Sequence, residues 1–179
     1  MEMANEHHDE ILGVIEDVKG FLKRPDGIPA YISKEHLFIE LTRILKHSSV
    51  GPDKKAEALD TSAALLASIS SKKNRKRTSK ASGDVSAGLD IVLPPAITQL
   101  SSKDGVVQQA SLKLIQQCLQ DSDDPKGVAI NDTIEHLADN GVRHKSDRIS
   151  VEVIKLLPGI YMEQIEVGWI KFNVKGQSL

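Results

Sequence analysis

Residues 93–120 read LPPAITQLSSKDGVVQQASLKLIQQCLQ, which is an apolar stripe, a polar break and a second apolar stripe. The spacing of both stripes predicts amphipathic helices. Pro94 and Pro95 predict either a kink in the first helix or its true start. The first stripe comprises Leu89, Val92, Leu93, Ala96, Ile97 and Leu100, and the second comprises Val107, Ala110, Leu114 and Cys118, with Leu112, Ile115 and Leu119 beside it.

The same unit of helix, short polar loop and helix is predicted three times, at about residues 35–69, 89–119 and 127–157. A repeat of roughly 40 residues built from two helices is typical of HEAT or armadillo arrays. One helical pair cannot bury its apolar faces alone, whereas stacked pairs can. The sequence therefore predicts an all-α fold, an α-solenoid of HEAT-like helical pairs.

A further helix is predicted before the repeats, through residues 5–24, with Asn5 as its N-cap. Ser33 is expected to cap the next helix, and Pro52 to be an early residue of the one that follows. The expected organisation is a capping helix and turn at 1–32, a first repeat at 33–70, a basic flexible linker at 71–83, repeats at 84–121 and 126–158, and an incomplete repeat or tail at 159–179.

Composition limits the classes of protein to which the chain can belong. The 23 basic and 25 acidic residues nearly balance, so no global field favours nucleic acid or a membrane as a partner. Aromatic residues are only 3% of the chain, which favours helix-on-helix packing over a sheet sandwich. The single Cys118 excludes an intrachain disulfide and is typical of a reducing compartment. Its place on an apolar stripe predicts a buried, inert thiol.

The N-terminal stretch MEMANEHHDE is acidic and polar, unlike a signal peptide or a mitochondrial presequence. No apolar run approaches the roughly 20 residues that span a bilayer. We expect a soluble, intracellular protein.

Signatures of catalysis and of metal binding are weak. The stretch HHDE at residues 7–10 holds potential metal ligands, but no second ligand group has suitable spacing, so a solvated helix start is the favoured interpretation. The chain contains no nucleophile elbow, P-loop, dinucleotide fingerprint or zinc knuckle. We therefore expect a protein that is not an enzyme and that needs no cofactor or metal.

The basic cluster KKNRKR at residues 72–77 has three interpretations: a solvated linker, a nuclear-import signal, or an electrostatic contact with an acidic polymer. Sequence-specific nucleic-acid binding is disfavoured because no aromatic platform accompanies the cluster.

The loops inside the three repeats are predicted to lie on one edge of the solenoid, since each joins the first helix of a pair to the second. Each loop brings basic residues to this edge, although ordinary surface lysines would give the same pattern. The residues of this edge are Val50, Lys54 and Lys55 in the first loop, Ser102 and Lys103 in the second, with Val106 just beyond, and Val142, Arg143, His144, Lys145 and Arg148 in the third.

These features resemble TOG domains, which are built of HEAT pairs whose inner loops form a basic edge facing tubulin. The stretch SVGPDKKAEALDTSAALLASI at residues 49–69 is similar to the second helix of a first TOG repeat. A bulky aromatic is typical of that first loop, and here Val50 or Pro52 stands near its place. The matching residues are Lys54, Lys55, Glu57, Ala58 and Leu59.

Further stretches are most similar to the N-terminal TOG domain of the crescerins, a family of ciliary TOG-array proteins. The resemblance covers residues 34–158, about three of the six repeats of a full TOG domain. The stretches that carry it are SKEHLFIELTRIL, LPPAITQL followed by ASLKLIQQCLQ, and DTIEHLADNGVRHKSDRISVEVIKLLP.

The resemblance implies a non-enzymatic module that binds tubulin or the microtubule lattice and supports ciliary microtubule organisation. It implies residence in the cytoplasm, cytoskeleton and cilium, with other ciliary proteins as further partners. The expected tubulin contacts are Val50, Lys54, Lys55, Lys103, Arg143 and Lys145. One alternative is a general HEAT-repeat scaffold without tubulin contact. A weaker one is a nuclear adaptor imported through residues 72–77.

Overall fold

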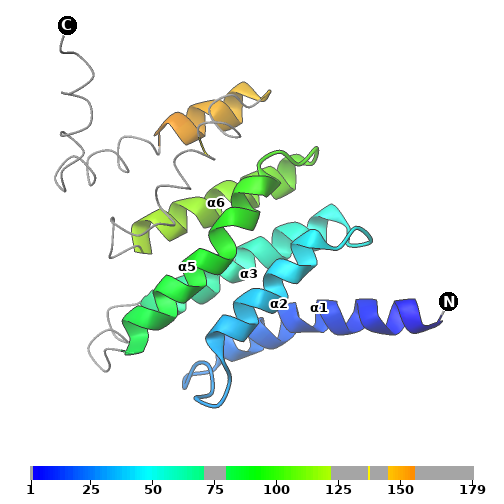
Figure 1. The fold of residues 1–179 in the computed structure, drawn as a ribbon, viewed down its shortest axis with the longest axis vertical. Coiled ribbons are helices and arrows are strands. Elements are labelled where there is room, and N and C mark those ends of the chain that lie inside the picture. The colour runs from blue at the N-terminus through cyan, green and yellow to red at the C-terminus, as the bar shows by residue number, and fades with distance from the viewer. Residues whose placement is uncertain (1, 71–79, 122–136, 138–144, 156–179) are drawn as a thin grey trace, which may run out of the picture. The chain divides into compact units, whose positions relative to one another are not determined.

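A computed structural model describes residues 2–70, 80–121, 137 and 145–155 (Figure 1). Within these residues every regular element is a helix and no strand occurs, which confirms the predicted all-α class. The chain divides into two compact units, Met1–Ser122 and Asp123–Leu179. The first unit contains α1 (Glu2–Lys23), α2 (Lys34–Lys46), α3 (Pro52–Ser70), α5 (Lys80–Gln99) and α6 (Gly105–Asp121).

The starts of the first three helices test the predicted caps. The Ser33 hydroxyl accepts a hydrogen bond from the backbone N–H of His36 at 3.2 Å, so Ser33 is the N-cap of α2 as predicted. Pro52 is the first residue of α3, also as predicted, because its missing N–H costs nothing there. The prediction for Asn5 is wrong, since α1 already begins at Glu2 and Asn5 lies inside it.

Helix α5 begins earlier in the chain than one of the two sequence-based alternatives allows. It continues through Pro94 and Pro95, which excludes a start at these prolines and leaves a kink as the other alternative. Each proline removes one backbone hydrogen bond, a loss that packing of the helix against its neighbours must offset. The helix begins at Lys80, so residues 80–83 are helical and are not part of a linker. Residues 71–79, the rest of the expected basic linker, lie outside the described residues.

Helix α3 is the centre of the first unit, since it packs against α1, α2, α5 and α6. The other contacts join α2 to α5, α5 to α6, and α1 to α2 (Figure 1). One helical pair, α2 with α3, therefore lies against the next, α5 with α6. Helix α1 packs on the first pair.

The core follows the apolar stripes that helical spacing predicts, both in the first repeat and in residues 89–119. On α2 these are Leu37, Leu41, Ile44 and Leu45, and on α3 Leu59, Ala63, Leu66 and Ile69, all of them buried. In α5 and α6 the predicted stripes are buried too, apart from half-buried Leu89, while the side chain of Leu119 lies outside the described ones. Cys118 is 1% exposed, which confirms its predicted burial. Phe38 and Leu65 are fully buried as well, because α2 and α3 each have more than one neighbouring helix.

The second unit is described at residue 137 and at residues 145–155, of which 147–155 are helical. Leu137, Ile149 and Val153 are buried, and Val151 and Ile154 are about half exposed, at 48% and 49%. Most of the expected third repeat at 126–158 and all of the segment at 159–179 lie outside the described residues.

Candidate functional site: a lysine-bearing loop edge

The inner loops of the two helical pairs lie at the same edge of the first unit. Packing of α2 on α5 and of α3 on α6 aligns the pairs. The side-chain amide of Gln99, at the end of α5, donates a 3.5 Å hydrogen bond to the Leu45 carbonyl, near the end of α2. Figure 1 shows both loops on the same side of the helices. We call residues 46–55 together with residues 100–106 the loop edge.

Val50 is one of the residues of the loop edge, but its side chain is not exposed on the surface of that edge. A turn closes the first loop, because the Val50 N–H donates to the His47 carbonyl at 3.4 Å and His47 Nδ1 lies 2.8 Å from the Ser49 hydroxyl. This turn folds the apolar Val50 side chain into the core, where it is 4% exposed. Val50, one of the expected tubulin contacts, therefore offers no exposed apolar surface to a partner in this structure.

Lys54 and Lys55, in the first turn of α3, differ in their electrostatic surroundings. The Lys54 ammonium donates a 2.7 Å hydrogen bond to Glu57, and its side chain is 46% exposed. Glu57 also accepts a hydrogen bond from Lys19 of α1. The half-buried Lys55 makes no ion pair within the described part of the chain. Lys55 therefore keeps its full charge for a partner, whereas Lys54 is already paired.

Two ammonium groups, those of Lys19 and Lys54, hold the Glu57 carboxyl ionised. The hydrogen bond from Lys19 and then that from Lys54 hold the pKa of the Glu57 carboxyl below its ordinary value, against an opposing effect of burial. The same contact with Glu57 raises the pKa of Lys19. Glu16, at 3.5 Å from the Lys19 ammonium, adds to this shift. Both partners therefore remain charged at neutral pH, and the ion pair joins α1 to α3.

The second loop is held by its own polar side chains. The Ser102 hydroxyl accepts from the Asp104 N–H at 3.2 Å, and the Asp104 carboxylate accepts from the Val106 N–H at 2.9 Å at the start of α6. Gln108 donates to the Ser102 carbonyl at 2.7 Å. Lys103 lies in this loop, where it is exposed and makes no ion pair with any described residue. Ser102 therefore has a structural role, and Lys103 is the charge that this loop offers.

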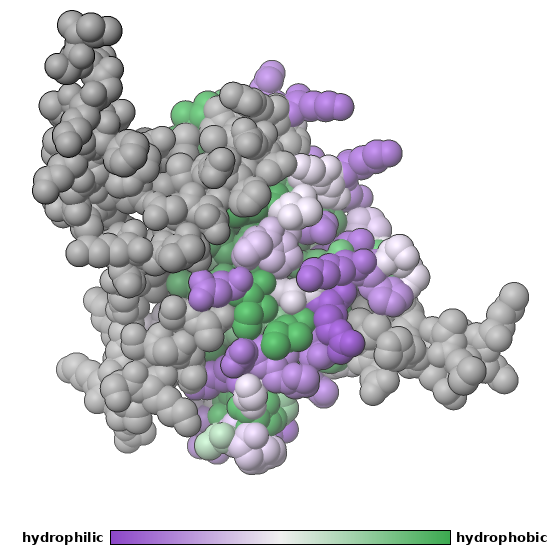
Figure 2. Space-filling model, in the orientation of Figure 1, coloured by the Kyte–Doolittle hydropathy of each residue, from purple (hydrophilic) through white to green (hydrophobic). Residues whose placement is uncertain are grey.

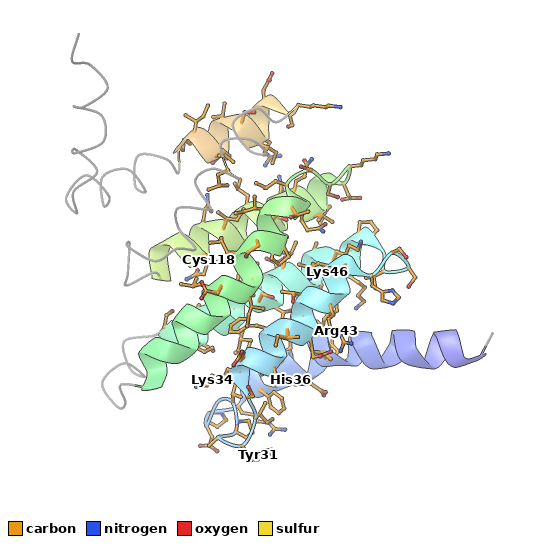
Figure 3. All side chains as sticks on the ribbon, viewed as in Figure 1. Tyr31, Lys34, His36, Arg43, Lys46 and Cys118 are labelled. Atoms are coloured by element: carbon orange, nitrogen blue, oxygen red, sulfur yellow. The ribbon has the colours of Figure 1, made fainter. Side chains whose placement is uncertain are left out.

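Lys46 is a member of the edge that the sequence analysis missed. It is exposed in the last turn of α2, beside the first loop (Figure 3), and it has no ion pair among the residues that the structure describes. Arg43, one turn earlier, is instead neutralised by Glu40 at 2.9 Å and 3.0 Å. The signal was present in the sequence, because a basic residue in a last helical turn lies beside the following loop.

A groove of about 420 Å³ opens beside the loop edge, between α1, α3 and the start of α6. Val106, which is 56% exposed, and Asp53 belong both to the edge and to the groove wall. Leu22, Ala56 and Ala64 supply further apolar surface, and the same wall also carries the carboxylates of Glu57 and Asp60. Figure 2 shows apolar patches between hydrophilic residues on the face turned to the viewer.

The remaining predicted contacts cannot be placed on this edge. Arg143, Val142 and His144 lie outside the described residues, as does the basic cluster at 72–77. Lys145 is exposed but belongs to the second unit, which is described by itself. The structure thus brings together Lys54, Lys55 and Lys103 of the predicted set and adds Lys46.

The stretch HHDE at 7–10 lies within α1. No group of three or more potential metal ligands gathers among the described side chains. Nor does any described helix combine the length and apolar character needed to cross a membrane.

Comparisons with protein families, with curated proteins and with solved structures found no match to this chain. The kind of partner that fits the loop edge is therefore inferred from the residues of the edge. Ammonium groups without internal partners, next to an exposed apolar side chain and a shallow groove, suit an acidic surface that also carries an apolar side chain.

Proposed function

We propose that the chain is a non-enzymatic, TOG-like HEAT-repeat module that binds tubulin or the microtubule lattice through its loop edge and supports ciliary microtubule organisation. The observation that carries the proposal is the common edge to which two successive helical pairs bring their inner loops. Lys46, Lys55 and Lys103 of this edge have no ion pair within the described residues. Pairs stacked in one direction are also how an α-solenoid grows, and the solenoid is part of the proposal.

Charge complementarity supports an acidic partner. Tubulin has a strongly acidic surface, and ammonium groups without internal carboxylates gain most from meeting one. Exposed charges of this kind act over a Debye length of about 8 Å at physiological ionic strength, so the association should weaken with salt. Val106 and the adjoining groove supply the apolar contact that Val50, being buried, cannot.

The burial of Val50 also supports a second candidate, a general HEAT-repeat scaffold that binds another protein and makes no contact with tubulin. On this alternative the lysines of the edge are ordinary solvated surface. The two proposals differ in whether neutralising the edge lysines changes microtubule binding.

Microtubule co-sedimentation of the full chain at low and high salt tests the proposal. The wild-type chain should pellet at low salt and much less at high salt. Replacing Lys55 and Lys103 with Gln should lower pelleting several-fold at low salt. A matched control replaces Lys113 and Lys155, two exposed lysines outside the edge that are paired with Asp60 and Glu152, and should pellet like the wild type.

The outcomes separate the candidates. A folded wild-type chain that does not pellet at low salt would rule out direct microtubule binding and leave the scaffold. Equal losses in both double variants would show that net charge acts, not the edge. A fluorescent fusion in ciliated cells tests location, where nuclear accumulation would instead favour import through residues 72–77.

A further inference from the structure

The lysines of the loop edge fall into two classes. Lys46, Lys55 and Lys103 have no carboxylate partner in the described structure. Lys54 does have one, because its ammonium lies 2.7 Å from Glu57 Oε2, one helical turn further along α3. The other oxygen of the same carboxylate, Oε1, accepts from Lys19 of α1. Glu57 is thus shared between the edge and the helix packed beside it.

We infer that Glu57 is a built-in competitor for the acidic partner of the loop edge, occupying Lys54 in the free protein until a partner carboxylate displaces it. The inference rests on the proposed function only in that it takes the partner of the edge to be an acidic polypeptide. The lysines of the edge recognise the carboxylates of the partner. Any acidic polypeptide can therefore serve as a probe of the competition.

The inference depends on the exchange of one carboxylate partner of Lys54 for another. An unpaired lysine that meets a partner carboxylate replaces contacts with water by an ion pair. Lys54 must first give up a carboxylate that it already holds, so its contribution to binding is only the difference between two similar ion pairs. In the wild-type chain, Lys54 therefore contributes less to the binding of an acidic partner than an unpaired lysine would.

Lys19 keeps the competitor in place. Its side chain is 33% exposed and that of Glu57 is 26% exposed, so the bridge between α1 and α3 is partly shielded from solvent. The lowered pKa of the Glu57 carboxyl agrees with a group that stays ionised and available to Lys54. Because α1 supplies Lys19, docking of α1 fixes the carboxylate that partly neutralises the edge.

A double-mutant cycle on the full chain tests the competition. Four chains are compared, namely the wild type, Lys54→Gln, Glu57→Gln and the double variant. The probe is a fluorescent poly-glutamate peptide whose affinity is measured by anisotropy at low salt. Glu57→Gln should raise affinity about threefold, a size typical of one exposed ion pair. Lys54→Gln should lower affinity by less than about 1.5-fold in the wild-type chain but by about threefold in the Glu57→Gln chain.

The Glu152–Lys155 pair provides the matched control cycle. It has the same 2.7 Å distance and the same spacing of three residues as Lys54–Glu57, and its lysine is exposed. Glu152→Gln and Lys155→Gln remove the same charges from residues outside the loop edge and the groove wall, and their effects should be additive. Circular dichroism melting of all variants checks that each chain remains folded.

Each result decides the inference. A larger effect of Lys54→Gln in the Glu57→Gln chain than in the wild-type chain supports it, whether or not the wild type pellets with microtubules, and a smaller effect there overturns it. Equal effects in both backgrounds, or no binding of poly-glutamate by any of the four chains, overturn it. Failure of microtubule pelleting with an intact Lys54–Glu57 coupling would overturn the proposed function instead.

Discussion

The backbone of Gly88 in α5 lies directly against the ring of Phe38 in α2. A Cβ atom added at Gly88 would stand 2.6 Å from Phe38 Cε2 and 3.1 Å from both Cδ2 and Cζ, closer than carbon atoms pack. Phe38 is fully buried at this contact. The glycine therefore sets how closely the second helical pair approaches the first.

Gly88→Ala should destabilise the protein by about 1–3 kcal/mol, since overpacking at Phe38 outweighs the gain in helix propensity. Urea denaturation measures the change in the free energy of unfolding. Gly20→Ala is the matched control, because Gly20 is exposed in α1 and a Cβ there meets no atom within 4 Å. It should stabilise by about 0.5–1 kcal/mol. Loss of stability in both variants would argue against the close contact of α2 with α5.

Ser33→Ala should destabilise the protein by about 1 kcal/mol, because it leaves the His36 N–H without its acceptor at the start of α2. Ser48→Ala, in the exposed part of the loop after α2, should change stability by less than about 0.5 kcal/mol. Thermal unfolding followed by circular dichroism compares the two. Equal effects would mean that the Ser33 cap contributes nothing measurable.

The Glu57 ion pairs should make stability depend on pH with a definite sign. The pKa of Glu57 is lower in the folded chain than its ordinary value of 4.5, so its contribution is present above that value. The contribution is lost as pH falls through the lower, folded pKa. The destabilisation caused by Glu57→Gln, about 1 kcal/mol or less near pH 7, should therefore shrink towards zero in acid.

Urea denaturation of the wild type and of Glu57→Gln at a series of pH values measures this difference. The contribution of Lys19 to stability depends on pH in the opposite direction. Its pKa is raised above 10.5, so its contribution is present below that value and is lost as pH rises through the folded pKa. A difference between the two chains that stays constant from neutral to acid pH would contradict the assignment.

Val106→Ser should weaken microtubule pelleting without unfolding the protein. The side chain is 56% exposed at the loop edge, so its removal costs little stability but takes away apolar contact area. An approximately two- to fivefold loss of affinity is expected for a peripheral apolar contact. Val151→Ser, at 48% exposure in the second unit, is the control for removal of an exposed valine. Unchanged pelleting by Val106→Ser would exclude the groove wall from the contact.

The sequence by itself determined the helices of the first unit, apart from where α1 and α5 begin, and the helix faces that are buried. Apolar spacing is a local property of the chain, so Leu37, Leu41 and Ile44 marked the inner face of α2 without knowledge of any neighbour. The starts at Ser33 and Pro52 are local too, because a cap needs only the next few residues. The basic residues of the inner loops were readable for the same reason.

Only the tertiary structure decided which of these residues can meet a partner. The sequence predicts Val50 as a contact with the partner, but the turn that follows α2 places it in the core. The sequence also predicts Lys54 as a contact, but Glu57 already neutralises it, and that carboxylate also accepts from Lys19, 38 residues away from it. Helical periodicity specifies a face of one helix and carries no record of which helix packs on it. Burial and charge pairing depend on that neighbour, so they follow from contacts between segments distant in the chain.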